Sequence, residues 1–511
     1  MSPFVPEEES DVSPTYDRLR EHLQEVWNIE RADAVLGWDE QVNMPPEGGR
    51  DRGQQAAALG RIAHTLFTSD ETGRLLDALE RDGYGEGERD EDFVVRVTRR
   101  DYDRSRKIPP ELVERHHLLA SEAYEAWARA RRAKDFALFA RPLERMLDVV
   151  TEEAERVDHP EGLYTSLLDL HGSDFTAKEL DVLFTELREA LTPLVKSISE
   201  RQDAVEGDFL HERWDEGRQW RAAEEALDAF NWPRGRTRLD RSIHPFTTSF
   251  SIRDVRITTR IDPDYFPMGF FGTLHEMGHA LYELGLPEDL QGTPAGDASS
   301  HAVHESQSRL YENMVGRSRP FWDFFFPKLR ELFPEHLEGR SPEEMYRAVN
   351  RSRPSFMRVE ADEVTYNLHI ILRYELEKAL LGGDLKVQSL PEAWNEKMKE
   401  LLGVVPADDL EGVLQDIHWS GGGFASFPSY TLGNVIAGQL MATIRRDLPN
   451  LDDEISEGRF AALGSWLTDR IYREGAKYQT KELVRRVTGK DLSTGPYLAY
   501  ITEKYRSLYS F

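Results

Sequence analysis

Hydrophobic residues recur every three or four positions over most of the chain, which is the spacing of helices with one buried face. The first such segment, residues 16–35, would place these large side chains on one helical face: Tyr16, Leu19, Leu23, Val26 and Trp27. The same pattern predicts helical structure in six further segments: 52–82, 109–157, 177–204, 342–350, 364–381 and 456–488. Polar, glycine-containing breaks at Asp82–Asp92 and Asp203–Asp215 are typical of surface loops.

The stretch His244–Arg260 departs from this spacing. It reads HPFTTSFSIRDVRITTR, is rich in Thr, Phe, Ile and Val, and alternates in part between apolar and polar residues. Such a pattern predicts two or three short β-strands. We therefore expect a mainly α-helical fold with a small sheet near residues 244–260.

The composition excludes several classes of protein. Of the 511 residues, 39% are hydrophobic, which is too many for a disordered chain. The 93 acidic and 64 basic residues give a net charge of −29, which argues against nucleic acid or an anionic membrane as a partner. Because the chain has no cysteine, it has no disulfide, thiolate metal site, iron–sulfur cluster or cysteine nucleophile.

The first residues carry neither the basic nor the apolar region of a secretory signal, and no apolar run approaches the roughly 18 residues of a membrane span. We therefore expect a cytoplasmic protein. Only 13 of the 64 basic residues are lysine. Many carboxylates with few lysines suit a strongly hydrated, halophilic surface, but GC-rich coding explains the same bias, and the composition leaves both explanations open.

Residues 270–284 contain the motif that most clearly predicts a metal site in this chain. Their apolar side chains alternate at spacings of four and three: Phe270, Leu274, Met277, Leu281 and Leu284. This stripe predicts a helix that ends at Gly285. On that helix His275 and His279, in the pattern His-Glu-x-x-His, lie one turn apart on one face and can hold one Zn²⁺, while Glu276 can take a proton from the attacking water. The alternative is a helix whose histidines are ordinary polar neighbours.

A catalytic zinc site needs a third protein ligand. The candidate is Glu305, which follows His279 by 26 residues, behind the Gly/Pro/Asp/Ser loop Gln291–Ser300. It lies on a second predicted helix that ends at Gly316. Two histidines and a glutamate form a known catalytic set. Two nearby histidines remain rival ligands on spacing alone: His301 and His304.

Several motifs, in order along the chain, resemble those of the thermostable, Taq-type zinc carboxypeptidases, metallopeptidase family 32. The matching segments span nearly the whole chain: Gly37-Trp38-Asp39 with Met44-Pro45-Pro46, His244-Pro245-Phe246, Asp254–Thr258 (DxRxT), His275–His279 (HExxH), His304–Gln307 (HESQ), Met357–Asp362 (IRxxAD) and Gly412–Trp419 (GxxQDxHW). The only departure within these motifs is Met357, which stands where the family has isoleucine.

The resemblance implies one large, zincin-like helical body with a divalent metal at the floor of a deep groove, and a homodimer. It also implies removal of single residues from peptide C-termini with broad specificity. By position, His275, His279 and Glu305 would bind the metal and Glu276 would be the general base. We expect a single domain over residues 1–511, with an N-terminal helical part of about 1–240 and a catalytic part of about 241–511.

A carboxypeptidase must also recognise a free α-carboxylate, for which a fixed guanidinium is the best partner. Arg358, in a matched motif and in a predicted helix, is the first candidate, and Arg256 is the second. Each has a structural alternative in a local carboxylate: Glu360 or Asp362 for Arg358, and Asp254 for Arg256. His244, in the first of the matched catalytic motifs, is a further candidate for contact with substrate.

The oxyanion of the reaction needs a donor besides the metal. His418 and Tyr430 flank the flexible sequence Gly421–Gly423 and both fit this role, although each is also compatible with a purely structural position. Asp416 is expected to orient a histidine. The strands near residue 244 would suit a substrate that adds to a sheet edge, or they only close the core.

The main prediction is a zinc-dependent carboxypeptidase that acts on peptides, with Co²⁺ or Mn²⁺ as substitutes in the same set of ligands. The first alternative is a zinc oligopeptidase that cuts internally. The second is a non-catalytic, zinc-containing helical binding protein, which the absence of cysteine disfavours because structural zinc sites are rich in cysteine.

Overall fold

The computed structural model describes residues 13–511. The first 12 residues, which include the segment inspected for a secretory signal, lie outside the described residues. The chain divides into two compact units. Unit 1 contains the residues up to Arg106 with Pro287–Asp297 and Gly475–Lys477, and unit 2 contains Lys107–Leu286, Ala298–Glu474 and Tyr478–Phe511. That residues 1–511 form a single domain stays a prediction.

Unit 1 consists mainly of four helices: α1 (Pro14–Val42), α2 (Gly49–Phe67), α3 (Asp70–Arg81) and α4 (Asp90–Arg106). The predicted helical segment 52–82 holds two of them. The chain breaks between them because the Ser69 hydroxyl accepts a hydrogen bond from the Thr72 amide and so caps the start of α3. In α1, Leu19, Leu23 and Val26 are buried, as their spacing predicted.

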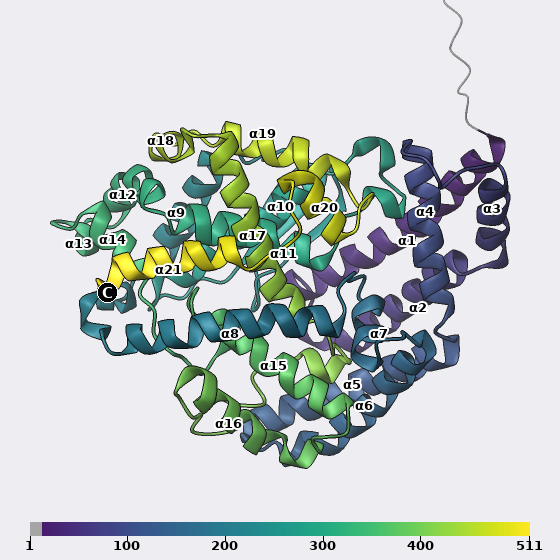
Figure 1. The fold of residues 1–511 in the computed structure, drawn as a ribbon, viewed down its shortest axis with the longest axis horizontal. Helices are drawn as coiled ribbons and strands as arrows, with labels where there is room; N and C mark the ends of the chain where they lie inside the picture. Colours follow the sequence, from purple (N-terminus) through teal and green to yellow (C-terminus); the bar gives the residue numbers. More distant parts are fainter. Residues whose placement is uncertain (1–12) are drawn as a thin grey trace, which may run out of the picture. The chain divides into compact units, whose positions relative to one another are not determined.

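Unit 2 holds the remaining helices and the sheet (Figure 1). Its helices are α5 (Pro110–Ala133), α6 (Ala137–Val157), α7 (Leu163–Leu170), α8 (Ala177–Ser199), α9 (Glu216–Ala229), α10 (Phe266–Leu284), α11 (His301–Arg309), α12 (Arg319–Leu332), α13 (Pro334–Leu337), α14 (Pro342–Val349), α15 (Tyr366–Leu381), α16 (Leu390–Leu402), α17 (Pro428–Asp447), α18 (Leu451–Ser456), α19 (Ala461–Arg470), α20 (Thr480–Thr488) and α21 (Gly495–Tyr509). The mainly helical fold is confirmed. Within residues 13–511, no helix combines the length and the apolar character needed to cross a bilayer.

Three short strands form the only sheet of the described chain: β1 (Thr237–Arg241), β2 (Thr247–Ser251) and β3 (Asp254–Thr259). The predicted sheet is therefore confirmed, with two of its strands in the predicted stretch, whereas β1 lies entirely upstream of it. The central strand β3 is parallel to β1 and antiparallel to β2, with Thr248 opposite Arg256. Val255 and Ile257 on β3 are fully buried, and the sheet packs against α10.

Helix α11 packs against both α10 and α17 (Figure 1). The hydroxyl of Ser300 caps its start by accepting from the Val303 amide. Its last turn passes into a π-helical segment, Leu310–Gly316, so the helical stretch ends at Gly316 as predicted. Helix α10 ends at Leu284 with Gly285 as its C-cap, also as predicted. These helices carry the side chains of the candidate site.

Candidate metal centre

The three predicted metal ligands converge in the structure. His275 and His279 lie on consecutive turns of α10, and Glu305 reaches them from α11. The Oε2 atom of Glu305 lies 3.8 Å from Nε2 of His275 and 3.5 Å from Nε2 of His279. One ligand atom from each residue fits within 4.8 Å of the others. Two imidazole nitrogens and one carboxylate oxygen at this spacing fit a divalent transition metal.

The hydrogen bond of His275 determines which of its nitrogens is free. Its Nδ1 lies 2.9 Å from Oε2 of Glu312, in the π-helical segment. Although burial opposes it, the charges of Arg309 and His275 hold the pKa of Glu312 down at about 2. Since an ionised carboxylate can only accept, Nδ1 of His275 carries the proton, and Nε2 keeps its lone pair for a metal.

His279 is oriented by a chain of two further side chains. The Nε2 atom of His304 lies 2.7 Å from Oε1 of Glu283, and its Nδ1 lies 2.5 Å from Nδ1 of His279. The Glu283 carboxylate accepts from Nε2 of His304, so Nδ1 of His304 accepts from Nδ1 of His279. His304, a rival ligand by spacing, therefore stands behind His279, and the exposed His301 belongs to neither group.

Replacing Glu283 with alanine should weaken metal affinity about 10- to 100-fold, because the relay would no longer hold the tautomer of His279. Glu283→Gln keeps an acceptor for His304 and should cost less. Competition with a coloured chelator measures both constants. Equal affinities in wild type and Glu283→Ala would show that the relay does not tune the ligand.

The remaining predicted ligand, Glu305, is oriented by an arginine one turn further along the helix. Nε of Arg309 donates to Oε1 of Glu305 at 2.7 Å, which leaves Oε2 directed at the two histidines. Burial raises the pKa of Glu305, but the charges of Arg309 and His275 outweigh it and hold that pKa well below its usual range. The cluster therefore presents one ionised carboxylate and two free imidazole nitrogens.

Two glycines allow α11 to lie this close to its neighbours. A Cβ on Gly278 of α10 would lie 2.6 Å from both the carbonyl oxygen of Gln307 and Cα of Ser308. A Cβ on Gly433 of α17 would lie 2.5 Å from Cγ of Glu305. Both distances are below any normal contact. The position of the Glu305 carboxylate thus depends on two residues that have no functional group.

Glu276 lies beside the cluster and is almost fully buried. The hydroxyl of Thr247, the first residue of β2, donates to its Oε2 at 2.6 Å, and the oxygen of that hydroxyl also lies 3.1 Å from the backbone carbonyl oxygen of Glu276. Burial raises the pKa of Glu276, while His275 and the Thr247 bond oppose that shift. The sheet therefore fixes the carboxylate in one orientation next to the predicted ligands.

Arg358 is buried, and the carboxylate that it binds is Asp416, in contrast to the alternative of a local pair with Glu360 or Asp362. It lies in a short 3₁₀ turn, Arg358–Glu360, so the prediction of an α-helix here is wrong. Its Nε and Nη2 donate to Oδ1 of Asp416 at 3.0 and 2.8 Å, and its Nη1 donates to the Tyr366 hydroxyl at 3.1 Å. The expected role of Asp416 in orienting a histidine gives way to a pair of arginines, because Arg373 binds its other oxygen.

The two predicted oxyanion donors contact each other. Nε2 of His418 lies 3.2 Å from the Tyr430 hydroxyl, and the guanidinium of Arg358 lies 5.2 Å from the centre of the Tyr430 ring. Burial lowers the pKa of His418 to about 4, so its imidazole is neutral near pH 7. Burial raises the pKa of Tyr430, which keeps its phenol protonated. Both groups can donate a hydrogen bond.

The other two predicted substrate contacts lie at the sheet. His244 is exposed in the connection from β1 to β2. Arg256, on the central strand, donates through Nε and Nη2 to the two oxygens of Asp254 at 2.9 and 2.8 Å, and its guanidinium lies over the Phe250 ring. This bidentate local pair matches the structural alternative for Arg256.

The Gly421–Gly423 sequence is anchored rather than loose. Glu377 of α15 accepts from the Trp419 indole at 2.8 Å, the Tyr164 hydroxyl at 2.8 Å and the Ala425 amide at 3.0 Å. On the same loop, His116 bonds the Gly421 carbonyl at 3.1 Å. These contacts hold the loop that carries His418, and they were not visible in the sequence because their partners lie tens to hundreds of residues apart.

Burial raises the pKa of Glu377 to about 7 from 4.5, so the folded state binds more protons than the unfolded chain between these values. The stability that protonation of Glu377 confers is present at low pH and lost as pH rises through 7. Wild type should lose about 2 kcal/mol relative to Glu377→Gln between pH 5 and pH 8. Denaturant unfolding of both proteins measures this, and a difference independent of pH would contradict it.

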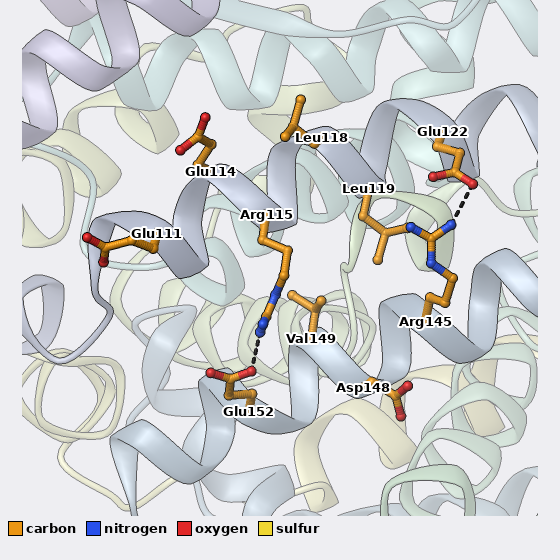
Figure 2. A pocket seen from close by; sticks show the side chains of 10 residues that line it. All are labelled: Glu111, Glu114, Arg115, Leu118, Leu119, Glu122, Arg145, Asp148, Val149 and Glu152. Carbon is orange, nitrogen blue, oxygen red and sulfur yellow. Dashed lines mark hydrogen bonds and ion pairs between the residues drawn. The ribbon is translucent and has the colours of Figure 1, made fainter.

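A separate groove of about 570 Å³ lies between α5 and α6 (Figure 2). Two arginines cross it, each paired with a glutamate of the other helix: Arg115 with Glu152 and Arg145 with Glu122. The groove has further acidic residues on its walls, and none of the predicted site residues lines it. It is a feature of the surface distinct from the metal centre.

The family model described as Carboxypeptidase Taq (M32) metallopeptidase matches residues 18–505. The chain is 42% identical over 504 residues to thermostable carboxypeptidase 1 of Thermus thermophilus, covering 97% of this chain and 99% of that protein. It is 36% identical over 488 residues to carboxypeptidase 1 of Bacillus subtilis, covering 95% and 97%. The crystal structure of the M32 carboxypeptidase from Deinococcus radiodurans R1 matches with a TM-score of 0.93 at 38% identity, covering 98% of this chain and 100% of that one.

Proposed function

This chain belongs to the M32 family of Taq-type carboxypeptidases, which are metallopeptidases, and from that membership we propose which of its residues carry out the reaction. The family resemblance predicted from the motifs is confirmed, and the protein is a metallocarboxypeptidase that hydrolyses peptides. We propose that it is zinc-dependent and removes one C-terminal residue at a time with broad specificity. The observation that carries this proposal is the convergence of His275, His279 and Glu305 beside Glu276.

The donor set of the cluster supports zinc as the resident metal, with Co²⁺ and Mn²⁺ as substitutes. A divalent cation held by these three residues would supply Lewis-acid polarisation of the attacking water and of the scissile carbonyl. The hydrogen bonds from Nδ1 of His275 to Glu312 and from Nδ1 of His279 to His304 leave the Nε2 atom of each histidine available to bind that cation. Metal analysis of the purified protein, followed by removal and add-back of each ion, tests the assignment.

Glu276 is the proposed general base. Its carboxylate is held by Thr247 next to the cluster, and burial brings its pKa closer to neutral than that of an exposed glutamate. It accepts the proton of the attacking water and delivers it to the nitrogen of the leaving amino acid. Because His418 and Tyr430 share one hydrogen bond, the member of the pair that accepts in it would keep its own hydrogen to donate to the developing oxyanion.

Arg358 is the proposed anchor for the substrate carboxylate. Of its five N–H groups, Nε, one at Nη1 and one at Nη2 donate to Asp416 and Tyr366, which leaves two without a partner among residues 13–511. A guanidinium held in place with two free N–H groups suits a terminal carboxylate. Such an anchor would place only the last peptide bond at the metal and so produce exopeptidase activity.

Main-chain pairing would explain broad specificity. Strand β2 is an edge strand of the sheet, since it pairs only with β3 among the described strands, and its first residue, Thr247, holds the proposed base. We propose that an extended peptide lies along this edge, where backbone hydrogen bonds are indifferent to side chains. His244, just before β2, would contact the substrate there.

The test of the anchor compares peptides that end in a carboxylate with the same peptides as C-terminal amides. Wild type should prefer the carboxylate, and Arg358→Met should raise its KM about tenfold or more. The matched control is Arg256→Met, which removes an arginine already paired with Asp254 and should leave KM nearly unchanged. The opposite ranking would assign the anchor to Arg256.

We also propose a homodimer, as the family resemblance implies, which sedimentation equilibrium tests. The surplus of 93 acidic over 64 basic residues supports the proposal of a surface suited to high salt. Activity and melting temperature measured from low to multimolar KCl test that proposal, and flat profiles would contradict it.

A further inference from the structure

Arg373 of α15 is the most deeply buried cation beside the proposed carboxylate anchor, and the reaction described above gives it no role. Its side chain is fully buried, and its guanidinium lies over the Trp394 ring at 4.6 Å. It donates to Asp416 Oδ2 at 2.6 Å, to the His369 carbonyl at 2.7 Å and to Oε1 of Gln415 at 2.8 Å. Enclosed in this way, it cannot reach a substrate.

Asp416 stands between the two arginines and uses one oxygen for each. Its Oδ1 accepts from Arg358 and its Oδ2 accepts from Arg373. Gln415, the preceding residue, links the same two arginines, because its Oε1 also accepts from the Arg358 amide at 2.8 Å. The geometry of the anchor is therefore shared among two adjacent residues of one loop and two arginines.

The charges of this cluster do not cancel. Two guanidinium groups and one carboxylate sum to one positive charge in a buried setting, where electrostatic interactions are stronger than in water. The neighbouring His418 is neutral near pH 7 and does not alter the sum. A lone Arg358–Asp416 pair would be neutral and would hold little attraction for a second carboxylate.

We propose that Arg373 is a positioning residue that neutralises Asp416 from the buried side and thereby leaves the charge and two N–H groups of Arg358 for the C-terminal carboxylate of the substrate. This inference rests on the proposed role of Arg358 and adds the reason why that arginine remains able to bind an anion although it is already paired. Asp416 then fixes the direction of Arg358 without consuming the positive charge of the cluster.

Three variants separate charge from structure. Arg373→Gln removes the surplus charge, Arg373→Lys retains it without the fork, and the double variant Arg373→Gln with Asp416→Asn restores a net charge of one on Arg358. KM and kcat are measured with an N-blocked dipeptide that ends in a free carboxylate. Arg373→Gln should raise KM about tenfold or more and change kcat less, because carboxylate binding is lost equally in the ground and transition states.

Arg373→Lys should keep KM within about threefold of wild type, and the double variant should bring KM well below that of Arg373→Gln, because the amide oxygen that replaces Oδ1 of Asp416 can still accept from Arg358. A purely structural Arg373 would give no such rescue, since the double variant removes more buried hydrogen bonds than the single one. An unchanged KM in Arg373→Gln, or a KM in the double variant as high as in the single variant, overturns the proposal.

Two further comparisons separate a folding defect, and a wrong assignment of Arg358 as the anchor, from a failure of the role proposed for Arg373. If Arg373→Gln does not fold, Arg373→Lys decides, because a raised KM there shows that charge balance is not what Arg373 supplies. Arg358→Met in the same assay tests the anchor itself. No change in KM for Arg358→Met rejects the anchor, whereas a raised KM there with an unchanged KM in Arg373→Gln rejects only the role of Arg373.

Discussion

Replacing Glu276 with glutamine should lower kcat about 10²- to 10⁴-fold and leave the bound metal in place. The amide is nearly isosteric with the carboxylate, and its oxygen can still accept from Thr247, so the side chain should keep its position. It cannot, however, accept the proton of the attacking water. Since Glu276 is not one of the three clustered ligand residues, metal content should not fall.

Steady-state kinetics on a blocked peptide and metal analysis of the same preparation check this pair of results. A fall in both kcat and metal content would make Glu276 a structural support of the centre. Turnover close to wild type would place the base elsewhere and reject the mechanism.

Replacing Gly278 with alanine should disrupt the metal centre although the change adds only one methyl group. The new Cβ would lie 2.6 Å from the backbone of Gln307 and Ser308, and a backbone cannot turn aside as a flexible side chain can. Helix α11 must therefore move away from α10 and carry Glu305 with it. We expect a destabilisation of about 1–3 kcal/mol and a loss of metal affinity of at least about tenfold.

Gly464→Ala is the matched control, because Gly464 lies in helix α19 and a Cβ there would meet nothing within 4 Å. Alanine favours a helix over glycine, so this variant should be neutral or stabilised by up to about 1 kcal/mol, with unchanged metal affinity. Metal titration and thermal unfolding compare the two variants. Wild-type metal affinity in Gly278→Ala would show that α11 does not depend on this contact.

The part of the centre that local spacing determines was accessible from the sequence. His275 and His279 face the same way because one helical turn separates them, and no long-range packing is needed to infer it. Glu283 and Arg309 follow His279 and Glu305 by the same four residues, so helical spacing alone gave a signal for both. Surface ion pairs have the same spacing, however, so this spacing alone does not identify a residue that orients a ligand.

The contacts that depend on how distant segments meet were not accessible. Asp416 lies 58 residues after Arg358 in a segment of irregular structure, so no periodicity relates the two. Gly433 carries no functional group, and its contact with Glu305 exists only once α17 and α11 have packed together. A turn inside a predicted helical segment was also missed. The hydrophobic pattern over residues 109–157 is that of a continuous helix, but the chain turns at Lys134, where φ is 56°.

Mass spectrometry of an N-terminally blocked peptide is the most direct test of metal-dependent removal of single C-terminal residues. The purified protein is incubated with the peptide alone, with a chelator, and with chelator followed by added metal. We expect a ladder of products that lose one C-terminal residue at a time, stopped by the chelator and restored by the metal. Internal fragments or released dipeptides, or a ladder that persists in the chelator, would contradict it.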